Sequence, residues 1–119
     1  MITALLPREL SRGGSTVSTW NMASYIILNY SVEDQAAFAA YQKEARDYVL
    51  SGVLDFLVYE PKTEVLEGEN VGHQTVVFRF ESAEKARSFY QSKEYQRVLP
   101  MRLRSTSKHF AILVSDRVI

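Results

Sequence analysis

Cysteine is absent from this chain of 119 residues, and histidine occurs only twice. The absence of cysteine excludes disulfide bonds, thiolate nucleophiles and metals bound through sulfur, and it is compatible with the reducing cytoplasm in which we expect the protein. The two histidines, His73 and His109, are too few for most histidine-rich metal sites. We therefore expect neither a metal ion nor a bound cofactor.

Long hydrophobic runs and a net charge are also missing. No stretch approaches the roughly 18 to 20 apolar residues that a membrane-spanning helix needs. The 14 Lys and Arg residues balance the 14 Asp and Glu residues, so no overall field attracts the protein to nucleic acid or to an anionic membrane. The composition predicts a soluble protein of one domain, with neither nucleic acid nor membrane as a partner.

The N-terminal part of the chain differs in composition from the rest. Residues 1–21 contain Gly, Ser and Thr in place of a periodic pattern, and a second methionine, Met22, stands directly before the first clear strand. We expect residues 1–21 to be a leader or an arm outside the domain, and residues 22–119 to form the domain. An upstream leader, a native arm that packs on a partner subunit and a targeting peptide are the three interpretations of this segment.

Periodic patterns begin at Ser24. Residues Ser24–Tyr30 are almost continuously apolar, which is typical of a strand that is covered on both faces. We expect Ser31 to be the N-cap of a helix, with Asp34 three residues later, and the helix to end near Gly52. Apolar residues follow one stripe of this helix, at Phe38, Tyr41, Ala45, Tyr48 and Val49.

The second half of the chain continues the alternation of strands and helices. Strands are predicted at 55–59, 63–67, 75–80 and 109–115, and a helix capped by Ser82 at 82–92, followed by a turn that Pro100 ends. Counting the two short segments at 55–59 and 63–67 as one strand, we interpret the order of elements as β, α, β, β, α, β, the order of a ferredoxin-like α+β domain. Both helices are then expected to cover one face of an antiparallel sheet.

The predicted strands are apolar on both of their faces. In the first strand Leu28 alternates with Ile27, and in the last strand Ile112 alternates with Leu113. One monomer has no helices left for the second face of the sheet, so we expect a second copy to pack against it, sheet on sheet. The sequence therefore predicts a homodimer.

Three segments resemble a known family. They are ASYIILNYSVEDQAAFAAYQKEA, VLEGEN and VVFRFESAEKARSFYQSKEYQRVLPMR, and the resemblance covers roughly residues 23–115. They are similar to the bacterial family called domain of unknown function 1330, within the dimeric α/β-barrel superfamily. The most specific part of the pattern comprises Phe80, Ser82, Ala86, Tyr90, Ser92, Glu94, Tyr95, Gln96 and Arg102. The resemblance implies a ferredoxin-like sheet that pairs face to face into a dimeric α/β barrel, and it assigns no activity.

The chain also departs from that family at several positions. Arg79 stands where the family commonly has an acidic residue, and Glu81 and Lys93 stand where it has prolines. Of the glycine-rich turn that usually follows the first helix, only Gly52 is present. A site that depended on those family residues cannot be carried over to this chain.

A local basic cluster surrounds the aromatic residues near Pro100. Arg102 is the best candidate for an anion site, because it matches the family pattern and a guanidinium can hold a carboxylate with two hydrogen bonds. Tyr95 could orient a substrate beside it, although its spacing also suits a core residue. The alternative for the cluster is a solvated face of the molecule, since runs of charge usually are.

Two polar residues interrupt the predicted central strands. Asn29 and Arg79 occupy neighbouring strands at positions where an apolar side chain would be expected. A buried guanidinium must be paired. Our first interpretation is an ion pair at a strand end between Arg79 and Asp55, and the alternative is a cluster of Asn29 and Arg79 that faces a substrate.

Two further residues are candidates for catalysis in the cleft between the sheet and the helices. His109 opens the last strand, and its titration near neutral pH suits a general base. Tyr41 lies on the sheet-facing stripe of the first helix, so its hydroxyl could point into the same cleft. The alternatives are an exposed or hydrogen-bonded histidine and a tyrosine ring that belongs to the core.

Two classes of function remain open. Members of the superfamily implied by the resemblance include monooxygenases, isomerases and dehalogenase-like enzymes, so the chain could be a monooxygenase, isomerase or lyase-type enzyme without a cofactor, acting on a small anionic or aromatic molecule in the cleft. The alternative is a non-catalytic module that binds a metabolite or another protein. Haem is a further possibility by the same analogy, and it would require His109 as the axial ligand.

Overall fold

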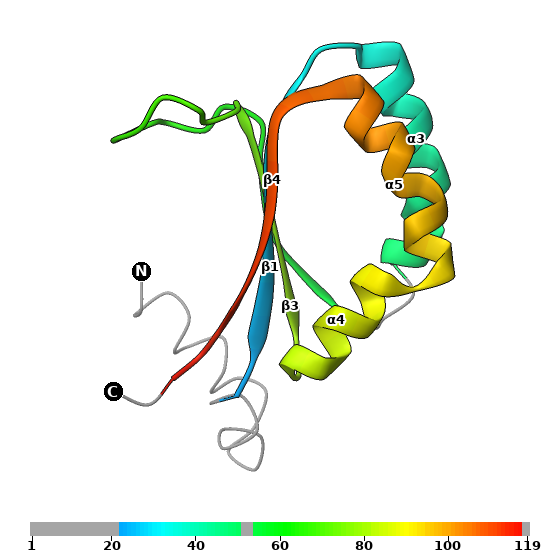
Figure 1. Ribbon diagram of the computed structural model, residues 1–119, viewed down its shortest axis with the longest axis vertical. Helices are drawn as coiled ribbons and strands as arrows, with labels where there is room; N and C mark the ends of the chain where they lie inside the picture. The colour runs from blue at the N-terminus through cyan, green and yellow to red at the C-terminus, as the bar shows by residue number, and fades with distance from the viewer. Residues whose placement is uncertain (1–21, 51–53, 118–119) are drawn as a thin grey trace.

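The computed structural model describes residues 22–50 and 54–117 (Figure 1). The elements along this part of the chain are β1 (Ser24–Val32), α3 (Gln35–Val49), β2 (Asp55–Glu60), β3 (Gln74–Phe80), α4 (Ala83–Gln91), α5 (Lys93–Ser105) and β4 (Thr106–Ser115). The strands form one antiparallel sheet in the order β2-β3-β1-β4. Helices α3, α4 and α5 lie on one side of this sheet (Figure 1). The predicted α+β architecture with an antiparallel sheet is confirmed.

The core lies between the sheet and the helices. Alternate residues of the two central strands point toward the helices, because side chains alternate between faces along a strand. Those of β1 include Leu28 and Tyr30, and those of β3 include Val76 and Phe78. Burial of each such side chain stabilises the fold by roughly 1.5 to 3 kcal/mol. On the helices the buried apolar positions are Phe38, Tyr41, Ala45, Ala86, Phe89, Tyr95 and Val98.

Helix α3 begins three residues later than the sequence predicts. Asp34, and not Ser31, is the N-cap: its Oδ1 accepts a hydrogen bond of 3.0 Å from the backbone N–H of Ala37. Ser31 belongs to β1, where it pairs with Ser107 of β4, so the strand pairing takes the residue that would otherwise cap the helix. The predicted end of the helix near Gly52 and the predicted leader at 1–21 lie outside the described residues.

Helix α5 replaces a predicted turn. The sequence suggests that Pro100 ends a short turn after the second helix, but residues 93–105 form one helix with Pro100 inside it. Its buried residues Tyr95, Val98, Arg102 and Ser105 are three or four positions apart, which is the spacing of a helical stripe. The packing of this stripe outweighs the cost of the hydrogen bond that proline cannot donate.

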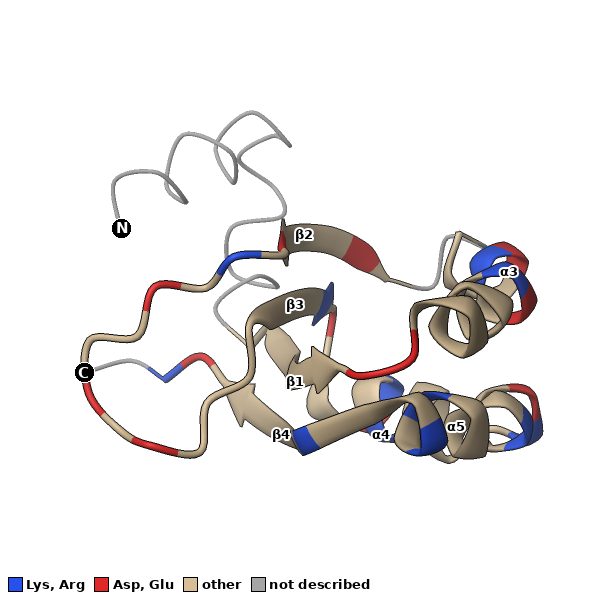
Figure 2. Cartoon of the chain, turned by 90° about the horizontal axis from the view of Figure 1, so that it is seen from above, with Lys and Arg blue, Asp and Glu red and all other residues tan. Residues whose placement is uncertain are grey.

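The strand predicted at 63–67 does not form. Residues 61–73 connect β2 to β3 as a loop that projects from the sheet, away from the helices (Figure 1). Val65 and Leu66 are both exposed, so neither face of this segment has a core to cover. Acidic residues lie along the loop (Figure 2). Its base is fixed by a hydrogen bond of 2.8 Å from the Thr63 N–H to the His73 carbonyl.

The face of the sheet that points away from the helices is apolar and exposed. Phe110, Ile112 and Val114 of β4 lie on this face, and 41, 46 and 41% of their surfaces are exposed. Ile27 and Val77, which pair across β1 and β3, lie on the same face and are half-buried. The two-sided apolar pattern of the strands therefore leaves one face of the sheet uncovered by the residues that the structure describes.

Candidate functional site

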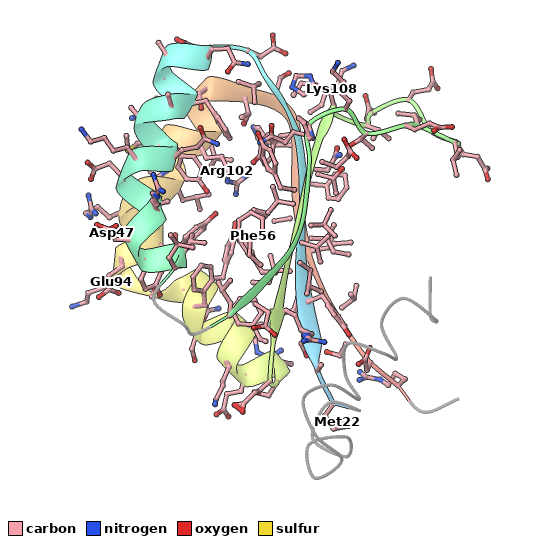
Figure 3. The ribbon with its side chains drawn as sticks, turned by 180° about the vertical axis from the view of Figure 1, so that it is seen from behind. Met22, Asp47, Phe56, Glu94, Arg102 and Lys108 are labelled. Atoms are coloured by element: carbon pink, nitrogen blue, oxygen red, sulfur yellow. The ribbon has the colours of Figure 1, made fainter. Side chains whose placement is uncertain are left out.

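A cavity of about 530 Å³ opens between α3 and the sheet. Its walls come from α3 and from the helix-facing sides of β1, β2 and β3. The apolar part of the lining includes Phe38, Phe56 and Phe78, and the polar part includes Tyr41 and Gln74. Cavities of this size and polarity bind small molecules in other proteins. Figure 3 shows Phe56 pointing from β2 into the space between the sheet and the helices.

Arg102 lies beside this cavity without a partner for its charge. It comes from the buried stripe of α5, and only 1% of its surface is exposed. Its guanidinium carbon is 5.6 Å from the centre of the Tyr30 ring, and Tyr30 lines the cavity. The Arg102 Nε has no hydrogen-bond partner, and no Asp or Glu forms an ion pair with the side chain within residues 22–50 and 54–117. Figure 3 shows Arg102 between the helices and the sheet.

Three tyrosines surround Arg102. The hydroxyls of Tyr41 and Tyr95 are 3.2 Å apart and share a hydrogen bond, and the Tyr30 hydroxyl accepts a hydrogen bond of 3.1 Å from Gln74 Nε2. Burial raises the pKa of Tyr41 well above its usual range, and it raises the pKa of Tyr30 as well. The hydroxyls of Tyr41 and Tyr30 are therefore neutral at physiological pH and can donate hydrogen bonds, but they do not neutralise a cation.

The guanidinium keeps its charge in these surroundings. An arginine side chain stays protonated in proteins at physiological pH; burial acts to lower the pKa of Arg102, and the neighbouring Tyr95 and Tyr41 act to raise it. The effect of the tyrosines on this pKa includes hydrogen bonding by Tyr95. The site therefore holds a buried cation among neutral polar groups.

The charged residues that line the cavity are both cationic. Lys43 and Arg46 are exposed residues of α3 at its mouth, and no Asp or Glu lines it among the described residues. The acidic residue between them in sequence, Glu44, instead accepts a hydrogen bond of 3.1 Å from Arg97 of α5. The field in the cavity thus favours an anion over a cation.

Arg102, Tyr41 and Tyr95 are the predicted site residues that the structure brings together. Arg102 and Tyr95 follow from the family resemblance, and Tyr41 follows from the stripe of the first helix. Gln74 and Tyr30 are not predicted as site residues from the sequence. They are cross-strand partners on the helix-facing side of the sheet. Lys43 and Arg46 are not predicted either, because a sequence does not show which exposed cations of a helix lie at the mouth of a cavity.

Asn29 and Arg79 do not face this cavity. Both lie on the opposite face of the sheet, because each is one residue out of step with the helix-facing positions of its strand. The Asn29 side chain accepts a hydrogen bond of 2.7 Å from the Gly72 N–H and donates one of 3.1 Å to the Gly72 carbonyl. A Cβ atom at Gly72 would lie 2.1 Å from the Tyr30 backbone. Asn29 therefore holds the loop at a position that only glycine can occupy, which corrects its placement in a substrate-facing cluster.

Arg79 forms the ion pair that the sequence suggests. Its Nη2 is 2.9 Å from Oδ2 of Asp55, and its Nε donates to the same oxygen at 3.3 Å. The Arg79 side chain is completely buried, and that of Asp55 is 31% exposed. The interpretation as an ion pair at a strand end is confirmed, so the cluster with Asn29 is not supported.

The structure does not bring His109 into the cavity. His109 is an exposed residue of β4, and it is not part of the cavity lining. The pairing of β1 with β4 is irregular between Asn29 and Ser31, and Lys108 has a φ of 51° at this irregularity. Lys108 and His109 together oppose Tyr30, which is the arrangement of a β-bulge and changes the direction of side chains along the strand. The proposed general base therefore does not join Tyr41 in the lining of the cavity.

Solved structures with the same fold come from several organisms. A protein of unknown function from Rhodopseudomonas palustris is 10% identical, with a TM-score of 0.63, and the match covers 90% of this chain and 95% of that one. A dimeric ferredoxin-like protein of unknown function from Thermobifida fusca is 10% identical, with a TM-score of 0.57 and coverage of 79% and 91%. A dimeric protein of unknown function and ferredoxin-like fold from Bacteroides fragilis is 12% identical, with a TM-score of 0.51 and coverage of 80% and 96%.

The sequence comparisons add a family. A family model described as domain of unknown function (DUF1330) matches residues 23–115. None of the curated proteins matches the sequence. At these levels of identity the solved structures establish the ferredoxin-like fold alone. Among residues 22–50 and 54–117, no helix is long and apolar enough to cross a membrane.

Proposed function

The chain belongs to the family described as domain of unknown function (DUF1330), and on that premise we propose that it is a homodimer that binds a small anionic molecule in the cavity between α3 and the sheet. Arg102 supplies the cation of this site, and the hydroxyls of Tyr41 and Tyr95 supply hydrogen-bond donors. The proposal rests mainly on one observation, the buried guanidinium of Arg102 without an acidic partner in the described chain.

The energetic argument is that an unpaired buried charge is costly. Removal of a charge from water costs several kcal/mol unless another charge or a set of hydrogen bonds compensates for it. The Tyr30 ring offsets part of this cost through a cation–π contact, worth about 2 kcal/mol where water is excluded. The remaining cost is offset when a ligand brings a carboxylate or a similar anion to the guanidinium. This favours a binding role for Arg102 over a purely structural one.

The cavity supports binding more than acid–base catalysis. Among the described residues that line it there is no His, Asp or Glu to accept a proton, and the raised pKa of Tyr41 makes its hydroxyl a poor base at neutral pH. Of the two classes that the sequence left open, we therefore propose the non-catalytic metabolite-binding module as the function.

Titration with simple carboxylates tests the site. The probes are benzoate and the straight-chain monocarboxylates from acetate to octanoate, followed by calorimetry or by NMR chemical shifts. Arg102→Met should weaken binding of the best probe at least about tenfold, because a hydrogen bond to a charged group contributes about 1.5 to 3 kcal/mol. Arg102→Lys should keep part of the affinity. Unchanged affinity in Arg102→Met would refute the role of this residue.

Arg97→Met is the matched control for this titration. Arg97 lies on the same helix, but it is exposed and pairs with Glu44 outside the cavity. Its replacement removes one positive charge from the protein, as Arg102→Met does, so it corrects for the change in overall charge. We expect affinity within about twofold of the wild type in Arg97→Met, because an exposed pair contributes little.

The uncovered face of the sheet supports the dimer. Its exposed residues Phe110, Ile112 and Val114 form an apolar surface of the kind that marks an interface. We propose that the same face of a second copy covers it, since the similar proteins from Thermobifida fusca and Bacteroides fragilis are described as dimeric. A two-fold symmetric arrangement buries the same apolar patch on both copies.

Sedimentation of two variants tests the dimer. Ile112→Asp places a charge in the centre of the proposed interface and should yield a folded monomer, because Ile112 is 46% exposed within one chain. Leu103→Asp is the control, since Leu103 is 39% exposed on α5, on the helical side of the molecule. A wild-type monomer, or a dimer that survives Ile112→Asp, would contradict this arrangement.

A further inference from the structure

Two exposed cations lie at the mouth of the cavity, in addition to the buried Arg102. The inference drawn from them rests on the proposed function. Lys43 and Arg46 are three residues apart on α3, so their side chains emerge on neighbouring sides of the same helix turn. Both line the cavity and both are exposed. Within the described residues neither forms an ion pair, whereas Arg97, Lys85 and Arg79 each pair with an acid.

The space between Arg102 on one side and Lys43 and Arg46 on the other has apolar walls. Phe38, Phe56, Phe78 and Val76 line the cavity from the helix and from the sheet. Arg102 is buried beside the ring of Tyr30, which lines this space, while Lys43 and Arg46 face solvent at its mouth. A molecule that satisfies all of these groups needs an acid at its inner end, an apolar middle and a second acid at its outer end.

We infer that the ligand is an organic molecule with two acidic groups, such as an aliphatic or aromatic dicarboxylate, whose inner carboxylate binds at Arg102 and whose outer carboxylate binds Lys43 and Arg46. The inner group meets the buried guanidinium of Arg102, which provides most of the affinity. The outer group meets exposed cations, which add less and depend on ionic strength. Selectivity for diacids over monoacids therefore comes from the rim.

The alternative origin of the rim is the stability of α3. Arg46 lies in the last turn of the helix, where a cation is favoured by the helix dipole. Lys43 lies one turn earlier and gains little from that effect. Dipole stabilisation explains Arg46 alone, and it makes no prediction about which ligands bind, so ligand selectivity separates the two explanations.

The experiment compares diacids with monoacids of the same chain length. Adipate, suberate and sebacate are titrated against hexanoate, octanoate and decanoate, at low and at physiological ionic strength. At low ionic strength we expect at least one diacid to bind about three- to tenfold more tightly than its matched monoacid, the effect of two exposed ion pairs. This advantage should disappear in the double variant Lys43→Gln/Arg46→Gln and shrink as salt is added.

The control is the double variant Lys62→Gln/Lys93→Gln, which changes the net charge equally. Lys62 and Lys93 are exposed and do not line the cavity, so the diacid advantage should persist in this variant. Thermal unfolding of both double variants without ligand verifies that they are folded before the titrations are compared.

Three results have distinct meanings. A diacid advantage that only the rim variant abolishes supports the inference. Equal or tighter binding of the monoacids, with affinity that still depends on Arg102, overturns the diacid inference and leaves the anion site in place. Binding of neither series to the wild-type protein overturns both the inference and the proposed function.

Discussion

Arg79 and Arg102 are buried to the same degree, with 1% of each residue exposed, but their surroundings differ. Arg79 lies on the far face of the sheet and forms two hydrogen bonds with Asp55. Arg102 lies on the helix side, beside a cavity, with a tyrosine ring next to its guanidinium and an Nε that has no partner among the described residues.

The difference separates a structural arginine from a binding one. Arg79 has its counter-charge within the chain, so its contribution is to the stability of the strand ends. Arg102 has neutral partners, so its charge is available to an anion that enters the cavity. Burial alone therefore does not indicate the role of an arginine, whereas the presence or absence of an acidic partner does.

The largest expected effect comes from removal of the acid that pairs with Arg79. Asp55→Asn should lower the free energy of unfolding by about 2 to 4 kcal/mol, because it removes the counter-charge of a buried guanidinium. The partial exposure of Asp55 to water reduces this loss of stability. Urea denaturation measures this change. Anion affinity in the cavity should remain at the wild-type value, because Asp55 faces the other side of the sheet. A loss of less than about 0.5 kcal/mol would contradict the role of the pair.

A smaller effect is expected for the hydroxyl of Tyr30. Tyr30→Phe removes the hydrogen bond from Gln74 and leaves a buried amide without that partner, so the protein should lose about 1 to 2 kcal/mol of stability. The ring beside Arg102 remains in this variant, and anion affinity should therefore hardly change. If Tyr30→Phe weakens anion binding as strongly as Arg102→Met, the hydroxyl and not the ring is the important neighbour of the guanidinium.

The smallest effect concerns stability at alkaline pH. Burial raises the pKa of Tyr41 above the ordinary value of 10.0, and so the unfolded chain releases this proton at a lower pH than the folded protein. Below pH 10 Tyr41 keeps its proton in both states, so the free energy of unfolding does not depend on it. Above pH 10 the unfolded chain loses this proton first, and the free energy of unfolding falls by at most about 1.4 kcal/mol per pH unit. Tyr41→Phe should have a shallower decline of unfolding free energy between neutral and strongly alkaline pH. An identical decline in the variant and the wild type would show that Tyr41 ionises equally easily in both states.

Much of the fold can be predicted from the sequence because its signals are local and periodic. The stripe at Phe38, Tyr41 and Ala45 indicates which side of the first helix is buried, and the alternating strands indicate a sheet with two apolar faces. Helix α5 does not follow from the sequence, because proline is a strong local signal for the end of a helix, while the burial of Tyr95 and Arg102 that overrides it depends on tertiary packing.

The site could be predicted only in part, for the same reason. The faces of Asn29 and Arg79 follow from the two-residue period of their strands once Tyr30 and Phe78 are known to face the helices, but the sequence does not identify the buried face. The position of His109 depends on the bulge at Lys108, which adopts a left-handed backbone conformation. A lysine in the sequence does not predict that conformation. Lys43 and Arg46 gain a role only from the cavity beside them.

The most direct test of the comparison measures the unfolding free energy of Arg102→Met and Arg79→Met without ligand. We expect Arg102→Met to be within about 1 kcal/mol of the wild type or more stable, because it removes a buried charge that has no acidic partner, and Arg79→Met to lose about 1 to 3 kcal/mol, because it breaks a buried ion pair. If Arg102→Met is instead destabilised by as much as Arg79→Met, Arg102 is a structural residue and the proposed anion site loses its main support.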